Sequence, residues 1–263
     1  MRVLIDSYLL VFCMKVWLQD MTWEEVEEAL DRSGNVAIIP VGSTEQHGKH
    51  LPLGTDSYNA IGLADDAAKR TGAVITPPIW FGWSPHHMWL PGTITLRPDI
   101  LTEVVVDVCK SLDHHGFKKI IIINGHRMAN LPPLQQAAAK VQMETDASII
   151  LLDPYPLSEK IRRELNIPEI GHGDEMETSH MIFLHPELVE MEKAVKYVPP
   201  PRKEISEVWF PHRLPTGEEL EERKEISGGA GAYPADATSE KGEKLHNALV
   251  DNIVKLIEEL KEK

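Results

Sequence analysis

The sequence predicts an α/β fold, with a mostly parallel β-sheet sandwiched between helices. Runs of Ile, Val and Leu recur along the chain, which is typical of strands buried on both faces. Amphipathic stretches of helical length separate these runs, as crossovers between parallel strands require. At 263 residues the chain has the length of one large domain, so a single domain is expected over residues 1–263.

Each element is placed by its apolar pattern and its flanking residues. The predicted strands are residues 36–41, 73–76, 118–124 and 147–152. The predicted helices are residues 57–70, 97–115, 131–144 and 238–263. Asp56 or Ser57 is the expected N-cap of the first helix, and Pro98 suits the first turn of the second. The Pro- and charge-rich residues 199–225 are expected to form a long excursion from this core.

Charge and cysteine content exclude several classes of protein. The formal net charge of −14 argues against a nucleic-acid-binding surface and against binding to an anionic membrane. The two cysteines, Cys13 and Cys109, form no CxxC pair, which fits a reducing cytoplasm. The apolar residues 3–18 are too short to span a bilayer. Residues 1–20 are therefore expected to be an N-terminal extension, either a strand or an overlong start with Met14 as the initiator.

The densest group of chemically active side chains, residues 45–56, directly follows the first predicted strand. Glu45 and His47 are two residues apart, so an extended backbone points both side chains to one side. Asp56 follows across a loop that contains Gly and Pro, and its two oxygens could bridge two ions. Carboxylates and imidazoles together suit Zn, Mn or Fe rather than Ca. The alternative is a loop in which the carboxylates cap helices and the histidines face solvent.

His126 extends this group, because it follows the strand predicted at residues 118–124. Ligands of open α/β sheets bind beyond the carboxyl ends of the strands. Both polar segments follow such ends, so they are expected to meet at one edge of the sheet. Gly125 would allow the backbone to approach an ion or a substrate closely.

Two further segments carry candidate residues. If residues 171–180 are helical, a carboxylate there could complete the ligand shell of a second metal; alternatively, Asp174 or Glu175 only caps the helix and complements its dipole. His87 lies in a loop rich in tryptophan. Its aromatic residues could wall a small, flat substrate pocket or could equally be packing residues: Trp80, Trp83 and Trp89.

Taken together, these segments resemble the creatininase family of binuclear metal amidohydrolases. The matching blocks occur in family order: residues 42–56, His87 with Pro91-Gly92-Thr93, Asn124-Gly125-His126, His172 with Glu177-Thr178-Ser179 and, more weakly, residues 231–238. The resemblance implies an α/β sandwich that holds two divalent metal ions, which would be Zn, Mn or Fe. It also implies a homo-oligomer, often a hexamer.

The resemblance further implies a role for each site residue. One ion would take Glu45, Asp56 and His126, while the other would take His47, Asp56 and Glu177. His172 would transfer a proton at the substrate, and Glu177 would also belong to the catalytic group. The candidate substrate contacts are His87, Trp89 and Arg127.

The chain departs from the family pattern after His126. Relatives usually carry Asn three residues after this histidine, whereas Asn130 stands four residues after it. Met128 replaces the acidic residue of a creatinine hydrolase, which argues against creatinine as the substrate. Arg127 suggests a different polar or anionic substrate, although it could simply be a surface cation.

The expected activity is hydrolysis of a small cyclic amide or a related carbonyl compound by a hydroxide that bridges the metals. A divalent metal lowers the pKa of bound water from about 15.7 to about 7. Two alternatives lie within the family: a hydrolase that opens a cyclic keto-polyol of the inosose type at a C–C bond, and a formamidopyrimidine deformylase. An alternative from a different class is a catalytically inactive binding protein on the same fold.

Overall fold

The computed structural model describes residues 14–167, 171–195, 221, 224–225, 228 and 234–262. The expected extension before Met14 and most of the expected excursion over residues 199–225 lie outside the described residues. None of the helices in the described part has the length and apolar character needed to cross a membrane.

Four parallel strands form one sheet, in the order β2-β1-β3-β4. Their bounds are β1 (Val36–Val41), β2 (Val74–Ile75), β3 (Lys119–Asn124) and β4 (Ser148–Leu152). In the register of the two central strands, Val36 lies opposite Lys119 and Val41 opposite Asn124. The carboxyl ends of β1 and β3 therefore lie side by side, so the loops that follow them leave the sheet at the same edge.

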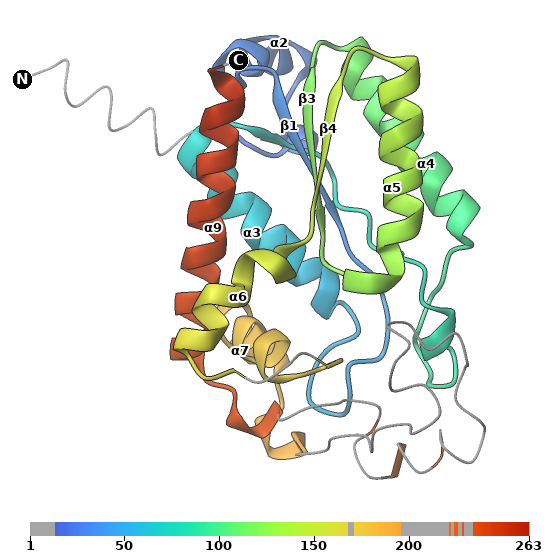
Figure 1. Cartoon of the computed structure of the whole chain (residues 1–263), viewed down its shortest axis with the longest axis vertical. Helices are drawn as coiled ribbons and strands as arrows, with labels where there is room; N and C mark the ends of the chain where they lie inside the picture. The colour runs from blue at the N-terminus through green and yellow to red at the C-terminus, as the bar shows by residue number, and fades with distance from the viewer. Residues whose placement is uncertain are drawn as a thin grey trace, which may run out of the picture.

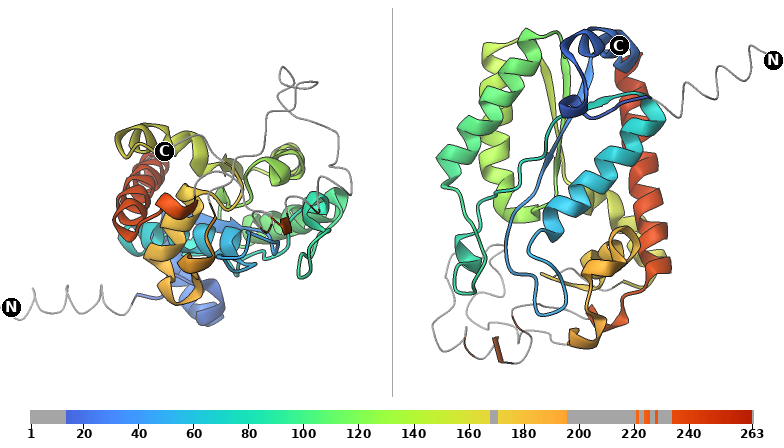
Figure 2. Two further views of the ribbon diagram at one scale, coloured as in Figure 1. Left: turned by 90° about the horizontal axis from the view of Figure 1, so that it is seen from below. Right: turned by 180° about the vertical axis from the view of Figure 1, so that it is seen from behind.

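Helices cover both faces of this sheet (Figure 1). Their bounds are α2 (Trp23–Ser33), α3 (Thr55–Thr71), α4 (Pro98–His114), α5 (Arg127–Glu144), α6 (Pro154–Glu164), α7 (Glu175–Leu184) and α9 (Ser239–Lys261), with 3-10 turns η1 (Leu18–Asp20), η2 (Pro85–His87), η3 (Pro186–Leu188), η4 (Met191–Lys193) and η5 (Pro234–Asp236). The α3 and α9 helices lie on one face of the sheet, and α4 and α5 lie on the other (Figure 2). The predicted α/β class is confirmed.

Alternation along β1 explains why both faces need a cover. Ile38 points into the cluster formed with α3 and α9, whereas Ala37 and Ile39 point into the cluster formed with α4 and α5. All six residues of the strand are buried. A strand that is apolar on both sides is stable only between two layers of helices.

Three local predictions need correction. The helix predicted at residues 57–70 is α3, which begins at Thr55 with Gly54 as its N-cap. Asp56 therefore lies in its first turn, and neither Asp56 nor Ser57 caps it. The α5 helix begins at Arg127 rather than at residue 131, because it runs through Pro132 and Pro133 instead of starting at them. Neither α2 nor α6 was predicted, although α2 opens with a capping box from Thr22 to Glu25 that the sequence displays.

Candidate metal centre

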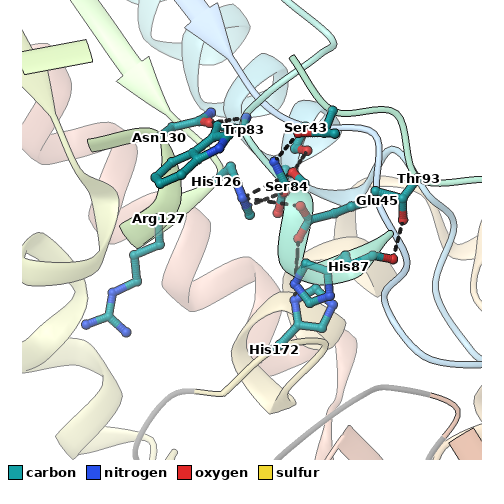
Figure 3. Close-up of polar contacts among 12 residues, drawn as sticks. Ser43, Glu45, Trp83, Ser84, His87, Thr93, His126, Arg127, Asn130 and His172 are labelled. Carbon is teal, nitrogen blue, oxygen red and sulfur yellow. Dashed lines mark hydrogen bonds and ion pairs between the residues drawn. The ribbon is translucent and has the colours of Figure 1, made fainter. Parts of the chain in front are cut away.

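Side chains from four separate segments meet beyond the carboxyl ends of β1 and β3. Figure 3 shows three of these side chains, Glu45, His126 and His172. Glu45 and His47 come from the loop after β1, and Asp56 comes from the first turn of α3. His126 directly follows Gly125 at the end of β3 and is the N-cap of α5. Glu177 comes from the first turn of α7, with His172 just before that helix.

Asp56 lies in the middle of the group, and its two carboxylate oxygens face different imidazoles. Its Oδ1 lies 3.1 Å from Nε2 of His47, and its Oδ2 lies 3.0 Å from Nδ1 of His126. Glu45 approaches His126 from another side, with 3.2 Å between Oε2 and Nε2. Glu177 completes the far side, where its Oε2 lies 3.7 Å from Nε2 of His47. Asp56 therefore joins two halves of one cluster.

Several carboxylate oxygens in the cluster lack hydrogen bonds. Both oxygens of Glu45 and Oδ2 of Asp56 are buried and accept no hydrogen bond of acceptable geometry in the described part of the chain, although imidazole nitrogens lie close to them. An isolated buried carboxylate is expensive unless it is paired or coordinates a metal. Three overlapping sets of donors here could each surround a cation: Glu45, Asp56 and His126; His47, His172 and Glu177; Glu45, His87 and His172.

Proximity of opposite charges perturbs the two central imidazoles strongly. Burial by itself would lower the pKa of His47, but Asp56, Glu177 and Glu45 outweigh it and raise this pKa to about 10. The pKa of His126 is raised to about 9, because Glu45 and Asp56 likewise outweigh the effect of burial. In turn, these imidazoles outweigh the effect of burial on Asp56 and lower its pKa. Without a metal, protons on His47 and His126 therefore balance the carboxylates.

The pKa values of Glu45 and Glu177 are both raised. Burial raises the pKa of Glu45. Burial also raises the pKa of Glu177 to about 8, with Asp174 and Asp56 adding to the increase. Carboxylates with raised pKa values beside a histidine are a common feature of functional sites.

A glycine at the end of β3 permits this arrangement. A Cβ atom on Gly125 would overlap the carbonyl oxygen of Asp56. The close neighbour of Gly125 is the backbone of Asp56, and this contact brings α3 and His126 together. The expectation that Gly125 also allows close approach to an ion or a substrate stays a prediction.

The acidic residues of residues 171–180 divide into two kinds. Asp174 is the N-cap of α7, where its carboxylate accepts hydrogen bonds from the backbone N–H groups of Glu177 (3.0 Å) and Gly171 (2.9 Å). Glu175 forms an ion pair with Lys241 of α9. The capping alternative is thus correct for Asp174, and Glu177 is the carboxylate that faces the cluster.

The candidate substrate contacts are placed differently from one another. His87 is buried with its Nε2 3.4 Å from Oε1 of Glu45, so it belongs to the cluster. The side chain of Arg127 points away from it (Figure 3), and its guanidinium lies 3.2 Å from the centre of the Tyr155 ring. Trp89 is partly buried and makes no polar or ring contact with the cluster among the described residues.

Sequence reasoning missed Ser84 and gave Asn130 no role. The Oγ of Ser84 lies 3.3 Å from Nε2 of His126 and 2.5 Å from Oγ of Ser43. Asn130, whose position departs from the family pattern, is buried and accepts a hydrogen bond from the backbone N–H of Trp83 while it donates to the carbonyl of Gly42. It ties the loops after β1 and β2 to α5. A serine in a loop carries no spacing signal, so only the structure could find Ser84.

Buried carboxylates and imidazoles at the carboxyl edge of a parallel sheet define a metal-dependent enzyme. A family model described as creatininase, creatinine amidohydrolase, matches residues 19–257. The chain therefore belongs to the creatininase family and is a metal-dependent hydrolase, as the resemblance implied.

Individual relatives match between 70% and 94% of the chain. A 3-dehydro-scyllo-inosose hydrolase of Thermotoga maritima is 30% identical over 94% of this chain and 84% of its own length. The creatinine amidohydrolase of Pseudomonas putida is 27% identical over 70% of this chain and 77% of its own. A solved manganese form of creatininase superposes with a TM-score of 0.76 at 25% identity, covering 93% of this chain and 98% of its own.

Proposed function

We propose that this protein binds two divalent metal ions at the cluster and hydrolyses a small cyclic carbonyl compound there. The observation that carries the proposal is the position of Asp56. Its two buried oxygens face His47 on one side and His126 on the other, as a carboxylate shared by two ions would. The charge of two cations would also compensate the oxygens that accept no hydrogen bond.

The donor atoms fit this assignment. Glu45, Asp56 and His126 would hold one ion, and His47, Asp56 and Glu177 would hold the other. Donors that share one ion at about 2.0–2.2 Å stand roughly 3.0–3.5 Å apart. The 3.0 Å between Asp56 and Nδ1 of His126 and the 3.1 Å between Asp56 and Nε2 of His47 agree with this, and the 3.7 Å between His47 and Glu177 needs only a small shift. Glu45 contacts the other ring nitrogen of His126, Nε2, so a shared ion would take one of the two nitrogens and one carboxylate would move toward it. One donor atom from each of Glu45, Asp56 and His126 lies within 4.8 Å of the other two. Mixed imidazole and carboxylate ligands suit Zn, Mn or Fe.

The bound ions would supply Lewis-acid polarisation and a water of lowered pKa. Within the protein, His172 is placed to move the proton. Its Nε2–H donates to the carbonyl of Gln46, so its Nδ1 is a free acceptor that faces the cluster. Burial and the nearby His47 keep the pKa of His172 well below its usual value, so the ring is neutral near pH 7. Transfer of this proton to the leaving atom is a role typically worth about 10²–10⁴-fold in rate.

For the substrate, we favour a cyclic keto-polyol of the inosose type over creatinine. The inosose hydrolase is 30% identical over 94% of this chain, and Met128 stands where the family resemblance implies an acidic residue in a creatinine hydrolase. A cyclic amide and a formamidopyrimidine remain the alternatives within the family. We also propose that the protein is a homo-oligomer, which light scattering of the purified protein would test. We further propose that it is cytoplasmic.

Metal analysis and a substrate screen test the proposal together. The purified protein is stripped with chelator, reloaded separately with Zn, Mn and Fe, and assayed against 3-dehydro-scyllo-inosose, creatinine and a formamidopyrimidine nucleotide. Two equivalents of bound metal and metal-dependent ring opening of the inosose would support it. Absence of bound metal would favour the inactive binding protein, and turnover of only one of the other substrates would overturn the choice of substrate.

A further inference from the structure

Gln46 contacts both histidines that flank Glu45. Its backbone N–H donates to Oγ1 of Thr93 (3.2 Å), which in turn donates to the carbonyl of His87 (3.1 Å). Its side chain reaches the ring of His87, and its carbonyl reaches the ring of His172. Gln46 is buried, with 3% of its surface exposed, so its polar groups bond to protein groups rather than to solvent.

The orientation of the Gln46 amide is fixed by a group that can only donate. The backbone N–H of Gly48 donates to its Oε1 at 3.1 Å. The other end of the amide, Nε2, is therefore the donor that lies 2.7 Å from Nδ1 of His87. Because Nδ1 of His87 accepts this hydrogen bond, the proton of the neutral ring must reside on Nε2.

The same residue imposes the opposite tautomer on His172. The carbonyl of Gln46 can only accept, so Nε2 of His172 carries the proton and Nδ1 does not. The two rings are stacked with their centres 4.0 Å apart, and both face Oε1 of Glu45. The His87 ring presents an N–H at 3.4 Å from this oxygen, whereas His172 presents a lone pair at 3.6 Å.

We propose that Gln46 fixes His87 as the Nε2–H tautomer, which makes His87 a positioning residue that directs an N–H group at Oε1 of Glu45. The 3.4 Å contact is not itself a hydrogen bond, and a small movement of Glu45 would make it one. It leaves Oε2 of Glu45 directed at His126, on the side of the proposed ion. It also means that Glu45, His87 and His172 do not form a third cation site, although their donors are close enough for one. Outer-shell donors of this kind orient metal ligands and typically contribute about 10–100-fold to metal affinity or activity.

A spectroscopic experiment tests the tautomer without any bound metal. Protein labelled with ¹⁵N-histidine and stripped of metal is examined by two-bond ¹H–¹⁵N correlation spectra, with the His87 signals assigned by their loss in His87→Gln. A His87 ring protonated at Nε2 only supports the proposal, and a ring protonated at Nδ1 only overturns it. In Gln46→Glu the new carboxylate cannot donate to Nδ1, so the His87 tautomer should invert or the ring should gain a second proton.

A pair of variants then tests the role of the donor. His87→Gln keeps an N–H near the position of Nε2, whereas His87→Leu has similar size but no donor. We expect metal affinity to fall about 10–100-fold in His87→Leu and to stay within a few-fold of the parent in His87→Gln. Equal losses in both variants, or three metal equivalents in the parent protein, would overturn the proposal.

The metal-affinity part of this inference rests on the proposed function, and these measurements distinguish failure of the one from failure of the other. A parent protein that binds no metal defeats the proposed function, while the tautomer of His87 is still read directly from the spectra. Unchanged melting temperatures of the two variants without metal exclude general destabilisation as the cause of a lost affinity.

Discussion

Two groups of buried histidines in this molecule have opposite electrostatic character. In the cluster at the sheet edge, His47 and His126 lie among carboxylates with oxygens that accept no hydrogen bond. In the second group, between α7, α9 and α3, His180 contacts His246 at 2.8 Å, and Nε2 of His246 donates to Asp66 at 2.9 Å. This second group is a continuous hydrogen-bonded chain that ends on a half-exposed carboxylate.

The pKa values show the same difference. Those of His47 and His126 are raised to about 10 and about 9, whereas burial, followed by the nearby His246, lowers that of His180 to about 3. His47 and His126 hold protons beside carboxylate oxygens that accept no hydrogen bond, whereas His180 stays neutral in a hydrogen-bonded chain. Buried histidine alone therefore does not indicate a metal site, and the carboxylate oxygens around it are the informative atoms.

The largest expected effect comes from replacing the aspartate of each histidine group. Asp56→Ala should abolish metal binding at both positions and lower turnover by more than the roughly 100-fold that outer-shell changes cause. Asp66→Ala, the matched change in the second group, should leave metal content and turnover near the parent values. Metal analysis and steady-state kinetics on folded protein measure both variants. Retained turnover in Asp56→Ala would remove the basis of the proposed function.

Proton release on metal binding should sharpen the comparison further. Because the raised pKa values of His47 and His126 keep both rings protonated near neutral pH, a metal must displace these protons. Affinity should therefore fall as pH falls below about 9, by about tenfold per pH unit for each proton displaced. Calorimetry in buffers of different ionisation enthalpy counts the protons. Heats that do not depend on the buffer would contradict this account.

One glycine in each region allows a test by steric overlap. A Cβ on Gly125 would overlap the carbonyl oxygen of Asp56, and one on Gly242 would overlap that of Ser179. Each change to Ala should lower the free energy of unfolding by about 1–3 kcal/mol, as overpacking does. Only Gly125→Ala should also lower the metal affinity of the folded protein, because only Gly125 lies beside a proposed ligand. Chemical unfolding and metal titration compare the pair, and equal affinities would contradict the role given to Gly125.

The smallest expected effect is the pH dependence that His180 contributes to stability. In the unfolded chain its pKa returns to about 6.5, while in the folded protein it is about 3. Between these values the unfolded state binds a proton that the folded state does not, so stability falls as pH falls, by about 1.4 kcal/mol per pH unit. Glu177, whose pKa is raised to about 8, has the opposite pH dependence, so the contribution of His180 is read as the difference between the parent and His180→Gln. Urea unfolding of both metal-free proteins at pH 7 and pH 5 should show that the parent gains less, or loses more, stability than the variant as pH falls. A variant with the parent's pH dependence would show that another group is responsible.

Much of the fold could be predicted from local patterns, because fully apolar runs such as residues 36–41 can be stable only inside a layered α/β core. Helix ends were harder to predict. Tertiary contacts of Asn130 accompany a helix that runs through Pro132 and Pro133, and this overrides the usual placement of proline in a first turn.

The candidate site could also be predicted in part from the sequence. Segments after neighbouring parallel strands must meet, so Glu45, His47 and His126 could be expected to converge before any coordinates were known. Spacing could not decide among the acidic residues of α7, since the choice of Glu177 depends on Asp174 being used as the cap. The contact of His87 with Glu45 depends on the path of two irregular loops, which no periodicity records.

The α7 helix packs against α9 and α3 rather than against the strands. A hydrogen bond from His172 to the carbonyl of Gln46 and one between His50 and Thr178 join its N-terminal region to the loop after β1. Glu177 thus reaches the cluster on an element that docks from outside the sheet, while Glu45, Asp56 and His126 are anchored at its edge. Loading of the two proposed cations should accordingly be sequential, with the strand-anchored position filling first. A substitution that loosens the packing of α7 would then give a protein that binds one equivalent of metal and no longer binds the ion held by Glu177.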